Sequence, residues 1–216
     1  MKKIAVILSG NGVYDGAEIN EAVLTLLHIA KAGAAYQCFA PDIDQMHTIN
    51  HLNGEPMDQN RNVLIEAARI ARGDIKPLTE LNAEHFDAVI LPGGFGAAKN
   101  LCDFAVKGAE AQLQSDIKVA CQQFASLKKP AGYICIAPVM IPLIYGAGAK
   151  ATIGNDADTA AAINTLGAEH INCAVNDIVV DKQHKLVSTP AYMLAESILE
   201  ADAGIEKLVT AVINMC

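Results

Sequence analysis

The stretch GYICIAP, residues 132–138, places a single cysteine at the end of an apolar run, with Pro138 three positions later. Residues 131–136 are typical of a buried strand, and a helix tolerates proline in its first turn. Cys135 is therefore predicted to lie where a strand ends and a helix begins, where the helix dipole lowers the pKa of a thiol. Pro142 would kink that helix. The alternative is a buried structural cysteine, a common fate of this residue type.

Strand and helix patterns alternate on both sides of this stretch. Apolar runs predict strands at residues 4–9, 34–41 and 87–96, and helical periodicity is found at 19–30, 61–71 and 118–127. In the first helix, the face predicted to be buried is Ile19, Ala22, Val23, Leu26 and Ala30. This alternation predicts a parallel sheet covered by helices on both faces.

Beyond Gly154 the pattern changes. A helix is predicted within residues 156–169, a hairpin from 176–181 and 185–191, and a final helix broken at Gly204. Residues 42–82 are polar and form a long connection, which we interpret as an insertion that serves as a pocket lid and an oligomer contact. We expect one domain over residues 1–216.

Composition narrows the class of protein. The 16 basic against 24 acidic residues give a net charge of -8, so no nucleic-acid partner is expected. No apolar run of about 20 residues could span a bilayer, and the short run ending at Ser9 is interpreted as a strand rather than a signal peptide. We therefore expect no membrane association and a cytoplasmic location.

The sequence offers no pattern typical of a metal site. The six cysteines include no C-x-x-C pair, so free thiols are expected. His47 and His51 have i, i+4 spacing but no further ligand nearby, and a solvated helix face is the preferred interpretation.

Ligands of open α/β sheets bind beyond the carboxyl ends of the strands. After the strand at 87–91, Gly93, Gly94 and Gly96 form either an oxyanion-binding loop or an ordinary tight turn. After the first strand, Glu18 is either a proton shuttle for Cys135 or the end of a capping box that starts at Asp15.

A rival motif follows the same first strand. Gly10, Gly12 and Gly16 suggest a dinucleotide fingerprint, but their spacing is G-x-G-x-x-x-G. The acidic residue Asp42 also lies further on than the usual ~20 residues. We therefore disfavour dinucleotide binding.

Several stretches together resemble the ElbB family, from about residue 3 to the C-terminus. They are VILSGNGVYDGAEINEAV (6–23), NHLNGE (50–55), RNVLIEAARIARG (61–73), LPGGFGAAKNL (91–101), CIAP (135–138) and TPAYMLA (189–195). ElbB is the glyoxalase-like branch of the PfpI/ThiJ superfamily, related to class I glutamine amidotransferases and in places labelled as an isoprenoid or lycopene biosynthesis protein. No residue here supports that label.

The resemblance implies a flavodoxin-like α/β sandwich and a cofactor-independent enzyme. It implies Cys135 as nucleophile, Glu18 as general acid/base, and the backbone N–H groups of Gly94 and Ile136 as the oxyanion site. The implied substrate is a small α-oxoaldehyde, either glyoxal or methylglyoxal, which becomes a hemithioacetal and then a hydroxy acid. Deglycase activity on adducts of other thiols and amines, and a homodimer or higher homo-oligomer, are also implied.

The chain departs from the superfamily in one respect. Many members have a histidine about 20 residues after the cysteine, whereas residues 151–158 contain none. Amidotransferase chemistry is therefore not expected. Asp156 or Asp158 could take that position, although neither is a good base at neutral pH. The alternative function is a non-catalytic redox sensor or partner-binding protein in which Cys135 is oxidised.

Overall fold

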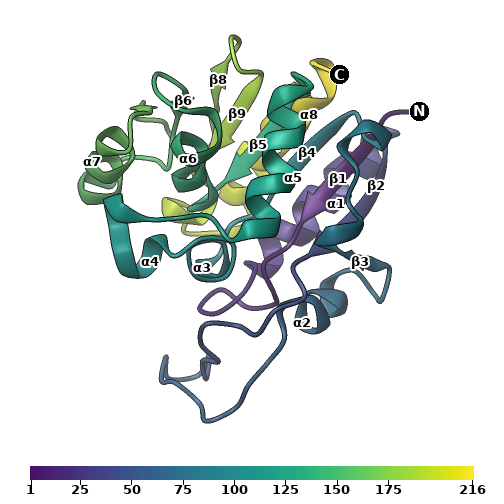
Figure 1. Cartoon of the computed structure of the whole chain (residues 1–216). Helices are drawn as coiled ribbons and strands as arrows, with labels where there is room; N and C mark the ends of the chain where they lie inside the picture. Colours follow the sequence, from purple (N-terminus) through teal and green to yellow (C-terminus); the bar gives the residue numbers. More distant parts are fainter.

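A seven-stranded sheet runs through the centre of the computed structural model, which describes all 216 residues (Figure 1). Its strand order is β3-β2-β1-β4-β5-β9-β8. The strands are β1 (Lys3–Ile7), β2 (Ala35–Ala40), β3 (Ile75–Pro77), β4 (Ala88–Leu91), β5 (Ala131–Ile134), β8 (Val179–Asp181) and β9 (Leu186–Thr189). Neighbours are parallel except β8 and β9, which form the predicted antiparallel hairpin. A separate small sheet pairs β6 (Lys150–Ala151) with β7 (Glu169–His170).

Helices cover both faces of the sheet, as predicted for a flavodoxin-like three-layer sandwich (Figure 1). One face packs against α1 (Ile19–Lys31), α2 (Val63–Ile70) and α8 (Ile198–Asn214), and the other packs against α3 (Phe95–Lys99), α5 (Ser115–Ser126), α6 (Ile141–Tyr145) and α7 (Ala157–Thr165). A short α4 (Phe104–Lys107) follows α3. Every residue of β4 and β5 is buried, which explains why these central strands are continuously apolar. No helix is both long and apolar enough to cross a membrane.

The buried face of α1 differs from the predicted one. Ala22 and Leu26 are buried as predicted, but Ile19 and Val23 are 46% and 48% exposed and Ala30 is exposed too. Ile29 is buried in their place. Apolar residues surround most of this helix, so periodicity alone could not select the face. Packing against α8 and the sheet selects it.

The helix α8 is continuous, so the predicted break at Gly204 is wrong. A Cβ at this position would lie 2.5 Å from Thr189 Oγ1 and 2.8 Å from the Val175 carbonyl oxygen. The glycine therefore allows the helix to approach the sheet closely, and it is not there to end the helix.

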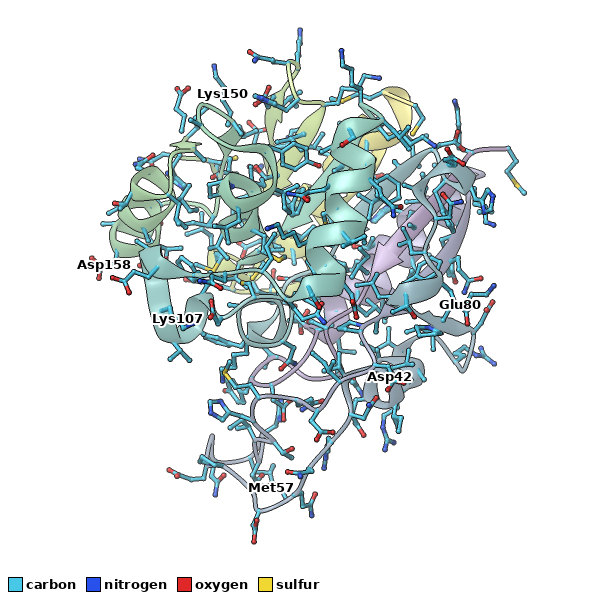
Figure 2. The ribbon with its side chains drawn as sticks, in the orientation of Figure 1. Asp42, Met57, Glu80, Lys107, Lys150 and Asp158 are labelled. Carbon is cyan, nitrogen blue, oxygen red and sulfur yellow. The ribbon has the colours of Figure 1, made fainter.

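The segment 42–82 has two parts. Residues 42–62 form a loop that projects from the sheet, with Asp42 at its base and Met57 at its far end (Figure 2). The rest contributes α2 and the edge strand β3, which pairs with β2. Residues 47–51 are not helical, so the helix face expected for His47 and His51 is absent.

Candidate active site

Cys135 lies directly after β5, on a sharp turn at the carboxyl end of the sheet. Its φ angle is 62°, an uncommon left-handed conformation for a residue with a side chain. Its backbone N–H donates to the Thr189 carbonyl oxygen at the end of β9, at 2.9 Å. The residue is 7% exposed, and that surface lines a pocket. Such a strained turn is typical of a nucleophile elbow.

The helix expected after Cys135 is not there. A 3-10 turn at Ala137–Met140 precedes the five-residue α6, and Pro142 lies in the first turn of α6 without kinking it. So short a helical segment has little dipole to lower the thiol pKa. Instead, burial raises the pKa of Cys135, while the N–H groups of Gly94 and Ile136 act in the opposite direction. The predicted lowering by a helix is therefore wrong.

The oxyanion candidates Gly94 and Ile136 line the same pocket as Cys135. Both backbone N–H groups are within reach of the Cys135 sulfur. Gly94 has a φ angle of 90°, and a side chain there would collide with the backbone of Gly16 and Glu18. Close packing of the two loops therefore requires glycine and brings α1 to the cysteine.

Glu18 is the N-cap of α1, since its carboxylate accepts a hydrogen bond from the Glu21 N–H at 2.7 Å. The capping box starting at Asp15 is therefore wrong. Asp15 is buried and accepts instead from the Ile49 N–H, also at 2.7 Å, which fastens the 42–62 loop. Glu18 also lines the pocket, and burial raises its pKa against the effect of nearby backbone N–H groups.

Glu21, one turn further along α1, is the carboxyl group in contact with the thiol of Cys135, and sequence reasoning missed it. It is completely buried and accepts hydrogen bonds from the N–H groups of Gly93 (2.9 Å) and Tyr192 (3.2 Å). Burial, and then the charge of Glu18, raise the pKa of Glu21 to about 8. A glutamate beside Ala22 on a largely apolar helix is a signal that could have identified it.

A pocket of about 370 Å³ opens above these groups. Its lining is mostly apolar and consists of Val13, Glu18, Gly94, Phe95, Cys135, Ile136, Asp156, Thr159, Tyr192 and Met193. None of residues 42–82 is among them, so this segment does not form the predicted lid over the Cys135 pocket.

The pocket contains no histidine. Asp156 is in the pocket, but its carboxylate caps α7 by accepting from the Thr159 N–H, and the two hydrogen bonds to Thr159 lower its pKa. It is therefore a poor base at neutral pH. Asp158 does not line the pocket.

The glycine loop after β1 is filled by protein atoms. The buried Asn100 side chain donates to the carbonyl oxygens of Ser9 and Asp15, both at 2.9 Å, and accepts from the Met46 N–H. These contacts leave no open cradle for a dinucleotide. No group of three or more His, Cys, Asp or Glu side chains is arranged to hold a metal ion.

Comparison with known proteins gives consistent relatives, although no family model matches the chain. It is 43% identical to the mitochondrial ES1 protein homolog of Rattus norvegicus, over 99% of this chain and 84% of the relative. It is equally identical to the human mitochondrial glutamine amidotransferase-like class 1 domain-containing protein 3, over 99% of this chain and 83% of the relative. The mitochondrial ES1 protein of Danio rerio is 33% identical over 88% of this chain and 76% of its own length.

Solved structures agree with the fold. An isoprenoid biosynthesis protein with an amidotransferase-like domain from Ehrlichia chaffeensis superposes with a TM-score of 0.93 at 33% identity, covering 100% of this chain and 99% of that one. A DJ-1 superfamily protein from Salmonella typhimurium gives a TM-score of 0.60 at 18% identity, over 99% and 91% of the two chains, which supports the fold alone.

The relatives contradict the predicted cytoplasmic location. The rat, human and zebrafish proteins are all named as mitochondrial. Composition and the lack of a membrane-spanning run do not distinguish one aqueous compartment from another, so that inference was not justified.

Proposed function

The chain belongs to the family of ES1 and glutamine amidotransferase-like class 1 domain proteins, and on that premise we propose a cofactor-independent enzyme. It converts glyoxal or methylglyoxal to the corresponding hydroxy acid through a hemithioacetal on Cys135. The observation that best supports this is the contact of a pocket-lining thiol with a fully buried carboxyl group, beside two backbone N–H donors. Nucleophile, proton carrier and oxyanion donors are then all present within one small site.

The proposed reaction needs no external oxidant or reductant. The Cys135 sulfur bonds to an aldehyde carbon, and the thiol proton passes through the carboxyl group of Glu21 to the aldehyde oxygen. A proton then moves from that carbon to the neighbouring carbonyl carbon, and the hydroxyl proton moves to the neighbouring oxygen, which leaves a thioester of the hydroxy acid. Water hydrolyses the thioester, releasing glycolate from glyoxal or lactate from methylglyoxal and restoring the thiol. The net change is the addition of one water molecule.

The two glutamates have different roles in this proposal. Glu21 contacts the thiol, and its pKa of about 8 leaves it largely protonated near neutral pH. Its carboxyl group can therefore donate a proton to the aldehyde oxygen while it accepts the thiol proton. Glu18 lines the pocket and faces the substrate carbons, where it relays the proton between them. The N–H groups of Gly94 and Ile136 donate to the developing oxyanion.

The test is time-resolved detection of glycolate with the wild type and with Cys135→Ser, Glu18→Gln and Glu21→Gln. Glyoxal loss alone is inadequate because lysine and arginine side chains consume it. We expect several equivalents of glycolate per wild-type chain and none above background from Cys135→Ser. A wild type that forms no more glycolate than Cys135→Ser refutes the enzyme proposal and leaves the redox-sensing alternative, which predicts a single oxidation of Cys135.

The resemblance to ElbB supports three finer proposals. The motifs quoted above favour the ElbB branch, and the same resemblance favours deglycase activity on aldehyde adducts. It also favours a homodimer or higher homo-oligomer, which light scattering coupled to gel filtration measures directly; a monomeric mass at micromolar concentration would contradict it.

A further inference from the structure

A second pocket adjoins the Cys135 pocket, and nothing in the proposed reaction of glyoxal uses it. It has a volume of about 370 Å³ and is lined by Tyr14, Ile49, Gly54, Phe95 and Lys99. Phe95 lines both pockets, and Tyr14 directly follows Val13 of the first pocket. The Phe95 N–H donates to the Val13 carbonyl oxygen at 2.8 Å. The two pockets therefore share one wall.

Size argues for a substrate larger than glyoxal. Pockets of about 300–1,000 Å³ typically bind drug-sized ligands, and each of these two pockets is already within that range. Glyoxal would leave most of the first pocket and all of the second unfilled. The side chain of Phe95, 48% exposed between them, offers an apolar surface to a molecule that extends across the wall.

Charge differs between the pockets. The first contains the carboxyl groups of Glu18 and Asp156, whereas the only charged group of the second is the Lys99 ammonium. That ammonium donates to the Tyr14 carbonyl oxygen at 2.9 Å and has no carboxylate within 4.0 Å. Since an ammonium has three donors, two remain for a ligand.

Lys99 is held in place rather than free on the surface. It is half-buried at the end of α3, and its ammonium lies 5.4 Å from the centre of the Phe95 ring. Its neighbour Asn100 hydrogen-bonds to the 42–62 loop and to the loop that follows β1, which holds this end of the helix in place. Burial lowers the pKa of Lys99, against the effect of Asp15, so the cation is partly desolvated. A partly desolvated cation interacts more strongly with an anion than one fully in water.

We propose that this second pocket is a subsite for the anionic end of the substrate, and that Lys99 binds its carboxylate or phosphate group. The inference rests on the proposed function and narrows its substrate class to aldehyde adducts with a negatively charged tail. The adduct of a small thiol with one aldehyde group of glyoxal is a hemithioacetal that keeps the second aldehyde group free. Cys135 bonds to the carbon of that free aldehyde. The bond to the small thiol then breaks, that thiol regains its proton, and the same enzyme hemithioacetal results as with glyoxal.

The first experiment compares kcat/KM for glyoxal adducts of three thiols: neutral 2-mercaptoethanol, 3-mercaptopropionate and 2-mercaptoethyl phosphate. We expect Lys99→Met to lower kcat/KM about tenfold for the anionic adducts, the loss of one charge-assisted contact, and to leave the neutral adduct unchanged. The two anionic arms show whether carboxylate or phosphate is preferred. Lys99→Arg should retain the preference, and Lys118→Met on the exposed surface of α5 controls for net charge. Equal values for neutral and anionic adducts in both wild type and Lys99→Met would overturn the proposal.

A second experiment is independent of turnover. The rate of Cys135 labelling by 3-maleimidopropionate is compared with that by N-ethylmaleimide, using peptide mass spectrometry to separate Cys135 from Cys173 and Cys216. We expect Lys99→Met to reduce the ratio of the two rates about tenfold. If no protein forms glycolate but the ratio still falls, the enzyme proposal fails and the subsite stands; if glycolate forms but the ratio is unchanged, the subsite fails alone.

Discussion

Replacing Glu21 by glutamine should destabilise the protein in weak acid and stabilise it at mildly alkaline pH. The pKa of Glu21 is raised by burial from 4.5 to about 8 in the folded protein. Between these values the native state retains a proton that the unfolded chain releases, so wild-type stability falls as pH rises, by about 1.4 kcal/mol per pH unit. Glutamine does not titrate, so the stability of the Glu21→Gln variant lacks this dependence on pH.

The magnitude follows from two opposing effects. From pH 5 to pH 7.5 the wild type should lose about 3 kcal/mol relative to Glu21→Gln. The amide can accept only one of the two hydrogen bonds from Gly93 and Tyr192, so one buried donor is left unpaired, at a cost of about 1–3 kcal/mol at any pH. We therefore expect the variant to be less stable than wild type at pH 5 and more stable at pH 7.5 and above.

The measurement is urea unfolding of both proteins at half-unit pH intervals from 5 to 8, analysed by linear extrapolation. Glu110→Gln, at an exposed position, shows the effect of the same substitution on the surface. A stability difference between Glu21→Gln and wild type that stays constant with pH would refute the argument, because it would mean that native Glu21 is ionised throughout this range.

Two further predictions concern close packing and side-chain hydrogen bonds to the backbone. Gly204→Ala should destabilise the protein by about 1–3 kcal/mol because its Cβ would lie 2.5 Å from Thr189 Oγ1. Urea unfolding measures this loss, and Glu206→Ala on the exposed side of α8 is the control. A Gly204→Ala protein as stable as the control and the wild type would contradict the prediction. Lys129→Met should cost about 2 kcal/mol because the Lys129 ammonium donates to three backbone carbonyl oxygens within residues 83–86. A Lys129→Met midpoint in urea equal to that of the wild type would show that water replaces these bonds without loss.

The sequence predicted the fold because its signals are local. Continuous apolar strands alternate with amphipathic helices, and that order permits few arrangements other than a parallel sheet covered on both faces. The hairpin of β8 and β9 was equally visible from two apolar runs around a polar turn. Prediction failed where one sequence pattern is compatible with two structures. The apolar residues of α1 allow more than one buried face, and Gly204 can either break a helix or let it pack closely.

The candidate site was predicted in part. Cys135 at the end of β5 and the glycine turn after β4 follow from strand ends, which are recognisable in sequence. Sequence reasoning selected Glu18, whereas the structure places Glu21 against the thiol and Glu18 in the pocket wall. Glu18 is the N-cap of α1 and Glu21 lies in its first turn. The apolar neighbours of Glu21 indicate burial, but the sequence does not say which of the two glutamates faces the cysteine.

The amino-acid sequence by itself thus determined the order of strands and helices, the layered fold and the position of the cysteine, because these depend on neighbours along the chain. The tertiary structure alone decided which glutamate is buried against the thiol, how its pKa is raised, and that Lys99 adjoins the cysteine pocket. These properties depend on solvent exclusion and on contacts between residues far apart in sequence. The Glu21 carboxyl group is excluded from solvent only when the helix, the Gly93 turn and the Tyr192 loop have packed around it.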